Sequence, residues 1–196
     1  MIFFSADLHF FHKNLCRGTS QWGPSNMVRD FDTPEEMNET IINNINSVIS
    51  KNDTFYILGD FCFGGVKNYM MRERINCSDV NYVCGNHSNK HGQEYDPVMP
   101  NGRNVSSLFS SYGFYKEIFY HKIPFILFHY PIYSWNHMSQ GSIHLFGHVH
   151  SLPEHKFFNG GKSMDVGLDG NGLMPYPIDE IVDIMKDKPI RKEGHH

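Results

Sequence analysis

The sequence predicts an α/β fold in which polar groups gather at the carboxyl ends of buried strands. Short apolar runs rich in β-forming residues are separated by segments with helical periodicity. Five of these runs end directly in aspartate, asparagine or histidine. Because ligands in open α/β sheets bind at the carboxyl ends of strands, these five run ends predict one functional site.

Length and composition fit one domain. The chain has 196 residues, of which 40% are hydrophobic. A domain of this size buries roughly 70% of the surface that its unfolded chain exposes. We expect residues 1–190 to form a single domain and residues 191–196 to be a disordered tail or a tag remnant.

The net charge and the cysteine usage limit the classes of binding partner and the cellular compartment that we expect. The net charge of −4, with mixed signs, provides no basic surface for duplex nucleic acid, although it is compatible with a nucleotide or a short single strand. The four cysteines form no CxxC pair and follow no signal peptide, which predicts reduced, mostly buried thiols. No apolar run approaches the roughly 20 residues that cross a bilayer. We therefore expect a cytoplasmic protein without membrane contact, in the host cytoplasm if a phage encodes it.

The first apolar run, Ile2 to Ala6, leads into Asp7-Leu8-His9. Positions i and i+2 of a strand share a side, so Asp7 and His9 can converge on one point. The loop that follows, from Phe10 to Asp32, is long for a compact domain, and such loops are often functional. Several of its residues suit a polar, phosphate-bearing ligand: His12, Lys13, Asn14, Arg17, Trp22 and Arg29. From this set we select His12, Asn14 and Arg17 as candidate substrate-binding residues.

A helix is predicted to start at Thr33. Thr33 can cap it, Pro34 suits the first helical position, and Glu36 completes a capping box. An apolar stripe at helical spacing follows and is assigned to the core: Met37, Ile41, Ile45 and Val48.

The next two apolar runs both end at a glycine. Thr54 to Leu58 is followed by Gly59-Asp60, and Asn81 to Cys84 is followed by Gly85-Asn86-His87. Glycine adopts backbone angles that are closed to other residues. At Gly85 this predicts a sharp turn that presents Asn86 and His87 at the end of the strand.

The second half of the chain repeats the pattern. Tyr115 to Tyr120 and Ile123 to Phe128 predict a hairpin, and its second strand runs into His129. Ile143 to Phe146 runs into Gly147-His148-Val149-His150, which has the same i, i+2 spacing as Asp7 and His9. Four further elements are expected: a short helix with Met70, Met71 and Ile75, a strand over 162–166, a glycine-rich turn over 167–172, and a helix carrying Ile178, Ile181, Ile184 and Met185.

The side chains that follow the five runs form one candidate metal site: Asp7, His9, Asp60, Asn86, His87, His129, His148 and His150. They offer nitrogen and oxygen but no thiolate, which suits manganese, iron, zinc, nickel or cobalt and not a closed structural zinc site. They are too many for one ion and suffice for two if a carboxylate bridges. Two divalent ions with two aspartates and a bridging hydroxide keep a positive charge that attracts a phosphate ester. An imidazole with a pKa near its ordinary value of ~6.5 can instead protonate a leaving alkoxide, so His87 need not bind metal.

At these residues the sequence resembles the calcineurin-like metallophosphoesterase superfamily, particularly its small single-domain bacterial and phage members. The matching stretches follow the order of the family: Asp7-Leu8-His9, Gly59-Asp60, Gly85-Asn86-His87, His129-Tyr130-Pro131 and Gly147-His148-Val149-His150. The resemblance implies a four-layer α/β/β/α sandwich of two mixed β-sheets, with the site at the carboxyl ends of its strands.

The resemblance also implies a role for each residue. One ion would be held by Asp7, His9, Asp60 and His150. The other would be held by Asp60, Asn86, His129 and His148, with Asp60 as the bridge. His87 would be the general acid. Manganese is the implied metal, with iron, zinc, nickel or cobalt as alternatives.

Two departures from the family pattern bear on His87. Ser88 stands where many relatives have aspartate, and Phe61-Cys62-Phe63-Gly64 replaces the arginine-bearing extension of protein phosphatases. The second change argues against a phosphoprotein phosphatase. The stretch from Asp7 to Asn14 matches the Asp-x-His-x-x-His-Lys-Asn opening of the nearest look-alikes, which places His12 at the border of the substrate.

These observations predict a dinuclear metal-dependent phosphodiesterase or phosphomonoesterase. Its expected substrate is a small nucleotide such as a 2′,3′-cyclic nucleotide, attacked by a metal-bridging hydroxide with His87 as the acid. One alternative is a nuclease on single-stranded ends that stacks bases on Phe and Tyr side chains. Another is a non-catalytic binder that keeps the metal site and sequesters a nucleotide.

Overall fold

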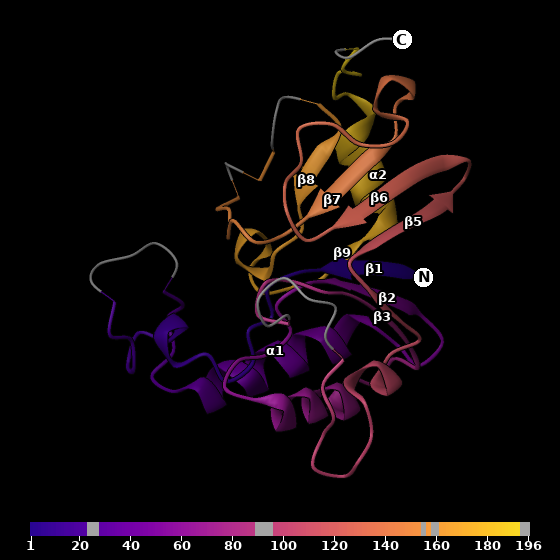
Figure 1. Cartoon of the computed structure of the whole chain (residues 1–196). Coiled ribbons are helices and arrows are strands. Elements are labelled where there is room, and N and C mark those ends of the chain that lie inside the picture. The colour runs from indigo at the N-terminus through magenta and orange to yellow at the C-terminus, as the bar shows by residue number, and fades with distance from the viewer. Residues whose placement is uncertain (23–27, 89–95, 154–155, 158–160, 193–196) are drawn as a thin grey trace.

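The computed structural model of the chain describes residues 1–22, 28–88, 96–153, 156–157 and 161–192. Of the tail predicted at 191–196, residues 193–196 lie outside the described residues. Parts of the long loop after the first strand and of the polar segment after Ser88 lie outside them as well. Within the described residues the chain forms two β-sheets and two α-helices, with short 3₁₀ helices between them (Figure 1).

The first sheet has the strand order β4-β3-β2-β1-β9. Its strands are β1 (Ile2–Ser5), β2 (Thr54–Leu58), β3 (Asp79–Val83), β4 (Ser111–Gly113) and β9 (Tyr176–Pro177). β1 to β4 are parallel, and β9 pairs with β1 in the antiparallel sense. The carboxyl ends of β1, β2 and β3 therefore lie side by side at one edge of this sheet.

The second sheet has the strand order β5-β6-β7-β8. Its strands are β5 (Tyr115–Tyr120), β6 (Ile123–Phe128), β7 (Ile143–Phe146) and β8 (Ser163–Asp165). β5 and β6 form the predicted hairpin, whose two turn residues His121 and Lys122 both have positive φ, at 47° and 68°. That backbone matches the twist of the flanking strands. β6, β7 and β8 are parallel, so the ends of β6 and β7 are neighbours.

The predicted helix after Thr33 is confirmed as α1 (Pro34–Val48). The hydroxyl of Thr33 accepts the N–H of Glu36, and the Glu36 carboxylate accepts the N–H of Thr33, which closes the capping box. Met37, Ile41 and Ile45 pack in one core with the outer face of the first sheet. The assignment of Val48 to this core is wrong, because Val48, in the last turn of the helix, is 41% exposed. The expected short helix around Met70 forms as a 3₁₀ helix, η2 (Val66–Arg74), whose Tyr69 and Met71 join the same core.

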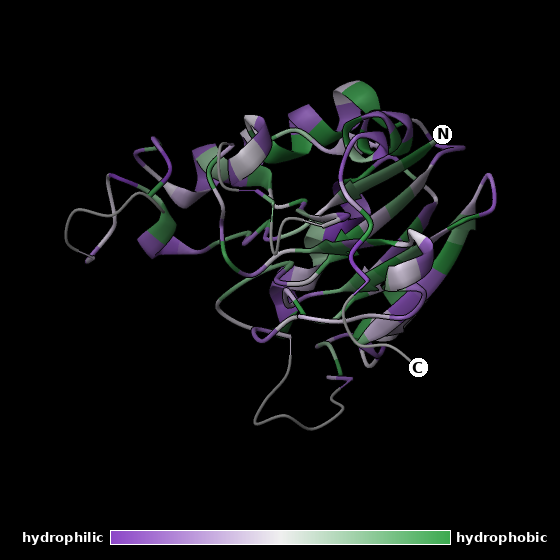
Figure 2. Cartoon of the chain, turned by 90° about the horizontal axis from the view of Figure 1, so that it is seen from above, coloured by the Kyte–Doolittle hydropathy of each residue, from purple (hydrophilic) through white to green (hydrophobic). Residues whose placement is uncertain are grey.

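The two sheets face each other across a second core. Phe4 of β1 stacks on Tyr56 of β2 and on Phe125 of β6, at ring-centroid distances of 5.3 and 6.1 Å. The same core contains apolar residues of both inner faces, among them Leu58, Val83, Leu127, Ile143, Leu145 and Met164. Figure 2 shows the strands as largely hydrophobic and the helices as alternating between the two classes. The α/β class and the two mixed sheets are thus confirmed.

The fourth layer of the sandwich differs from a regular helical layer, because the helix α2 (Ile178–Lys186) does not cover the outer face of the second sheet. Its Ile178, Ile181 and Met185 pack into the core between the sheets, and Tyr120 on the inner face of β5 donates to Asp179 at 2.6 Å. The helix follows β9 directly, so it stays beside the edge strand of the first sheet. The outer face of the second sheet is instead covered by the segment around Trp135 and Met138, which packs on Ile126.

The remaining elements are short 3₁₀ helices: η1 (Lys13–Leu15), η3 (Val105–Leu108), η4 (Met138–Gln140) and η5 (Leu168–Asn171), the last in the glycine-rich turn. All four cysteines are buried, as predicted, and none of them forms a disulfide with another. Among the described residues, neither helix has the length and apolar character that crossing a bilayer requires.

The capping box yields a stability prediction. Thr33→Ala removes the hydroxyl that accepts the Glu36 N–H, and we expect the free energy of unfolding to fall by about 1 kcal/mol. Urea unfolding followed by circular dichroism measures the change. Ser47→Ala is the control, because among the described residues the exposed Ser47 hydroxyl bonds only to the Asn44 carbonyl of the same helix. An equal loss in both variants would contradict the assignment.

Candidate metal centre

Seven predicted ligands converge where the ends of β1, β2 and β3 meet the ends of β6 and β7. The first group of contacts surrounds His9. Its Nε2 lies 3.1 Å from Nε2 of His150, 3.8 Å from Oδ1 of Asp7 and 3.7 Å from Oδ2 of Asp60. Nε2 of His150 is 4.0 Å from Oδ1 of Asp7. Four residues from three strand ends of two sheets thus point their donor atoms at one small volume.

The second group surrounds Asn86. Its Oδ1 lies 2.9 Å from Nε2 of His129 and 3.0 Å from Nδ1 of His148. Nε2 of His129 is also 3.5 Å from Oδ2 of Asp60. Asp60 Oδ2 therefore lies within 3.7 Å of a histidine nitrogen in each group. Its other oxygen, Oδ1, accepts the backbone N–H of His87 at 3.0 Å, so the carboxylate is held with Oδ2 between the two groups.

The hydrogen-bonding state of these atoms fits cations. His129 donates Nδ1–H to the Leu58 carbonyl at 2.8 Å, so its Nε2 is a lone pair, and it faces the acceptor oxygen of Asn86. Asp7 Oδ2 accepts the N–H of His148 at 2.8 Å, whereas its buried Oδ1 has no hydrogen-bond partner among the described residues. Acceptors that face one another in a buried site call for a positive charge between them. The donor set, nitrogen and oxygen without thiolate, suits borderline and hard divalent ions.

Burial sets the protonation of several of these groups. It lowers the pKa of His9 well below the ordinary value, and it lowers that of His129, so both imidazoles are neutral at pH 7. Neutral imidazole is the form that binds a metal. Burial raises the pKa of Asp7, and the nearby carboxylates of Asp165 and Asp60 raise it further against the opposing His150. A buried cation would favour the ionised form of Asp7.

The backbone of the ligands is as unusual as their side chains. Five of the seven have left-handed φ angles: Asp7 at 56°, His9 at 51°, Asp60 at 48°, His148 at 73° and His150 at 49°. A non-glycine residue in this region costs on the order of 1–3 kcal/mol, and such residues cluster at functional sites. These angles turn the backbone sharply after each strand and direct the side chains of the candidate ligands toward the gap between the sheets.

The motif glycines provide the space in which the ligands meet. A Cβ at Gly59 would lie 2.0 Å from Nδ1 of His129, and one at Gly85 would lie 2.2 Å from Oδ1 of Asp60. At Gly147 it would lie 2.5 Å from Oδ2 of Asp7. The sharp turn expected at Gly85 is present, because the N–H of Ser88 donates to the Gly85 carbonyl at 3.2 Å. The unusual backbone angles expected there are wrong, because Gly85 is not among the residues with positive φ. Its glycine is required for the close approach of a carboxylate from the neighbouring strand.

Sequence reasoning missed the residues that hold His150. Asp169 Oδ2 accepts Nδ1–H of His150 at 2.7 Å, which leaves Nε2 free to face Asp7 and His9. Arg29 donates to both oxygens of Asp169, at 2.7 and 3.0 Å. Burial acts to raise the pKa of Asp169, but the Arg29 charge and these hydrogen bonds outweigh it and hold that pKa well below the ordinary value. The sequence signal that could have identified Asp169 is its position as an acidic residue in the glycine-rich turn over 167–172.

Arg29 was expected among the ligand-facing residues of the long loop, and the structure places it elsewhere. Its side chain is buried and also donates to the carbonyls of Asp7 at 2.7 Å and Leu8 at 3.0 Å. The guanidinium thus ties the loop to the Asp-x-His segment and to Asp169. Asp165, at the end of β8, accepts the N–H groups of Ser151 and Gly167 at 2.9 and 2.7 Å and fixes the chain after His150.

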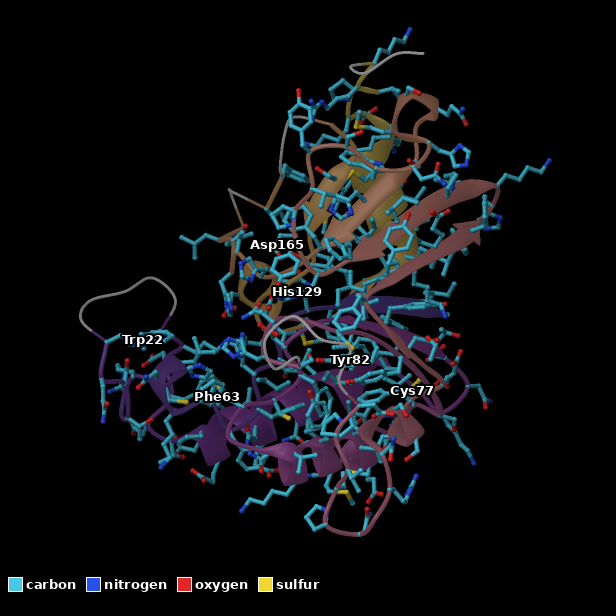
Figure 3. The ribbon with its side chains drawn as sticks, in the orientation of Figure 1. Trp22, Phe63, Cys77, Tyr82, His129 and Asp165 are labelled. Atoms are coloured by element: carbon cyan, nitrogen blue, oxygen red, sulfur yellow. The ribbon has the colours of Figure 1, made fainter. Side chains whose placement is uncertain are left out.

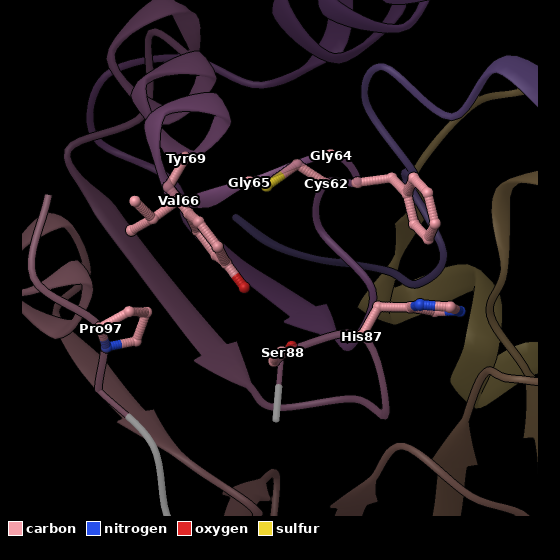
Figure 4. Close-up of a pocket in the computed structure, with 9 residues that line it drawn as sticks. Cys62, Gly64, Gly65, Val66, Tyr69, His87, Ser88 and Pro97 are labelled. Carbon is pink, nitrogen blue, oxygen red and sulfur yellow. The ribbon is translucent and has the colours of Figure 1, made fainter. Parts of the chain in front are cut away.

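His87 stands at the open side of the centre. Its side chain is exposed, and its Nε2 is 3.9 Å from Oδ2 of Asp60. Ser88 stabilises the turn that precedes it and does not contact the imidazole of His87. The Ser88 hydroxyl accepts the N–H of Gly85 at 3.1 Å and shares a hydrogen bond with the buried Tyr82 hydroxyl. Figure 4 shows the imidazole of His87 pointing away from Ser88.

The predicted substrate-binding residues divide into two groups. His12 and Asn14 line a cavity of about 360 Å³ together with metal-site residues such as His9, Asp60 and His148. Arg17 does not line this cavity; its guanidinium donates to Asp30 at 2.6 Å and to Asp32 at 2.7 Å. Figure 3 shows Trp22 and Phe63, which also line the cavity, on the side of the molecule from which the long loop projects.

Comparison with known proteins places the fold. No family model matches the sequence. The chain is 29% identical over 195 residues to MJ1445, an uncharacterized protein of Methanocaldococcus jannaschii, covering 97% of this chain and 94% of that protein. AQ665, a protein of unknown function from Aquifex aeolicus, has a TM-score of 0.61 at 19% identity, covering 94% of this chain and 99% of that chain, which shows a shared fold. YfcE, described as a phosphoesterase from E. coli, has a TM-score of 0.44 at 16% identity, with coverage of 85% and 77%.

The close approach at Gly85 can be tested with a matched pair of alanine variants. Gly85→Ala places a methyl group against Asp60, and we expect it to destabilise the fold by about 1–3 kcal/mol and to weaken Mn²⁺ binding. Gly113→Ala is the control, because a Cβ there meets no atom within 4 Å and its φ is ordinary. Thermal unfolding and calorimetric Mn²⁺ titration measure both effects. Equal behaviour of the two variants would refute the role of Gly85.

The hydrogen bond to His150 yields a second prediction for the centre. In Asp169→Asn the carboxylate that fixes the His150 tautomer is lost, and we expect Mn²⁺ affinity to fall by roughly 10–100-fold. Titration calorimetry gives the affinity. Asp30→Asn, which alters only the exposed pair with Arg17, is expected to leave it unchanged. Full affinity in Asp169→Asn would show that His150 is oriented by other contacts.

Proposed function

We propose that this chain is a metal-dependent phosphoesterase of the calcineurin-like kind that its motifs resemble. The observation that carries the proposal is the position of Asp60, whose Oδ2 lies between His9 and His129 and is therefore placed to bridge two ions. One ion would be held by Asp7, His9, Asp60 and His150. The other would be held by Asp60, Asn86, His129 and His148. We propose manganese for both positions, with iron, zinc, nickel or cobalt as alternatives.

The bound ions would lower the pKa of water toward neutrality and neutralise the charge of a phosphoryl group. The protein holds their ligands in place before substrate arrives. Asp60 is fixed by the His87 N–H, His129 by the Leu58 carbonyl and His150 by Asp169. Such preorganisation means that little of the centre has to rearrange during the reaction.

His87 is the group we assign as general acid. Its imidazole is exposed at the mouth of the cavity, on the side where a leaving group would depart, and it can donate a proton to the leaving oxygen. Its backbone N–H, bonded to Asp60, keeps it at a fixed position relative to the ions. The substrate we propose is a phosphodiester or phosphomonoester of a small nucleotide, such as a 2′,3′-cyclic nucleotide.

The alternatives receive less support. A sequestering binder would need no acid, yet His87 is present and the turn that carries it is held by Ser88 and Tyr82. A nuclease on single-stranded ends would use the aromatic side chains around the cavity for stacking. The net charge of −4 gives such a strand no basic track to follow.

Two substitutions separate metal binding from proton transfer. Asp60→Asn should lose metal and turnover together, because the shared ligand is weakened. His87→Ala should keep both metals and lose turnover by roughly 10²–10⁴-fold. The assay is hydrolysis of bis-p-nitrophenyl phosphate with Mn²⁺, accompanied by metal analysis of the purified protein.

The metal analysis also decides the role of His87, which lies close enough to Asp60 and His9 to be a ligand itself. Loss of one ion in His87→Ala would assign it to the metal. Wild-type protein without chelator-sensitive hydrolysis would refute the enzymatic proposal.

A further inference from the structure

Phe63 lies where three cavities meet. Its side chain lines the cavity over the metal centre, a second one of about 360 Å³ beside Tyr69 and Ser88, and a third of about 330 Å³ beside Lys13. It follows Asp60 by three residues and is 41% exposed. An exposed phenylalanine at the entrance to a metal centre has no role in the core, so its aromatic face is available to a ligand.

Phe63 belongs to an aromatic wall formed by Trp22, His12, Phe63 and His87. The His12 ring lies 4.3 Å from Phe63 and 5.6 Å from Trp22, measured between centroids, and Phe63 lies 5.3 Å from His87. Trp22 is 41% exposed, like Phe63, whereas His12 between them is buried. At its inner side the wall meets the proposed metal ligands, since the His12 ring lies 5.2 Å from that of His9. Figure 3 shows Phe63 and Trp22 farther out, away from the labelled His129. Apolar aromatic faces of this kind stack planar rings.

Asn14 adds a polar group to the same cavity. Its Oδ1 accepts the backbone N–H of Gln21 at 3.1 Å, and because a backbone N–H can only donate, this contact fixes which way the amide points. Its NH₂ makes no hydrogen bond to a described residue. It is therefore left to donate to a ring nitrogen or carbonyl oxygen, the acceptors found on the edges of nucleobases.

Charge limits what else the cavity can hold. None of the described residues that line it is lysine or arginine, and the guanidinium of Arg17 is occupied by Asp30 and Asp32. A single phosphoryl group can be neutralised by the metal centre alone. Within this cavity, a di- or triphosphate chain would meet no lysine or arginine among the described lining residues.

We propose that the outer part of the aromatic wall, formed by Trp22, His12 and Phe63, is a nucleobase subsite, and that the substrate is a nucleoside ester with one phosphoryl group. This inference rests on the proposed function, because it assigns the phosphoryl group to the metal centre. The base stacks on Phe63 and Trp22, its edge accepts from Asn14, and the sugar oxygen departs beside His87.

The test compares two ligands that differ in the base. Adenosine 5′-monophosphate and ribose 5-phosphate are titrated calorimetrically into the Mn²⁺-loaded protein, with phosphate release followed in parallel. We expect the nucleotide to bind at least about tenfold more tightly, because stacking on aromatic side chains contributes on this scale. Phe63→Leu keeps an apolar side chain but removes the aromatic face. It should reduce the advantage to about twofold or less while ribose 5-phosphate binds as before.

Trp22 supplies an independent readout, because the protein has two tryptophans and Trp135 is buried. Adenosine 5′-monophosphate should quench the Trp22 fluorescence, and Trp22→Leu should abolish that quenching. Phe119→Leu, which removes an exposed ring on β5, is the matched control and should leave the nucleotide preference at tenfold.

Two results would overturn the subsite: equal affinity of the wild type for both ligands, or an equal loss for both in Phe63→Leu. The titrations need no turnover. A nucleotide preference without chelator-sensitive hydrolysis of bis-p-nitrophenyl phosphate would therefore refute the enzymatic proposal and leave the subsite standing.

Discussion

The carboxylate of Asp60 is the contact on which the assembly of the centre depends. Through its two oxygens it faces the ends of β1, β3 and β6, so that one side chain links both sheets. A second buried carboxylate, Asp7, lies close enough that the charge of Asp60 raises its pKa, and its Oδ1 has no hydrogen-bond partner in the described part of the chain. Buried like charges are stable only with compensation. The fold therefore brings together a set of groups that calls for cations.

The strained backbone at the ligands is held by the structure around it. His9 donates its N–H to the Asp60 carbonyl at 2.9 Å, and Asp7 donates to the Gly59 carbonyl at 3.2 Å, which continues the β1–β2 ladder beyond the strands. Gly147 donates to the His129 carbonyl at 2.9 Å in the second sheet. These bonds, with the Arg29 clamp on Asp7 and Leu8, offset the left-handed angles. Ligand positions are thereby set by backbone, which moves less than side chains.

The convergence of these side chains could be predicted from the sequence because its signals are local. A β-rich run followed by a ligand can be read from consecutive residues, and so can the capping box at Thr33 and the hairpin turning at His121. The partners of those ligands come from distant parts of the chain. The contact between Asp169 and His150 spans 19 positions, and that between Arg29 and Asp169 spans 140. The need for glycine at position 85 likewise comes from the approach of Asp60, which is distant in sequence. The position of α2 depends on the pairing of β9 with β1.

Ser88 and Phe63, where the sequence departs from the pattern of the family that it resembles, both bear on the surroundings of His87. Ser88 has turned inward to Tyr82 and holds the turn without placing a charge beside His87. Phe63, in the segment where protein phosphatases carry arginine, presents a ring to His87 and His12. Neither residue places a charge beside His87, while the seven candidate ligands converge on the other side of the centre. With the proposed ions bound, the site would combine a positively charged centre with adjacent aromatic surface, which is what the proposed ester of one phosphoryl group and a planar, uncharged base requires.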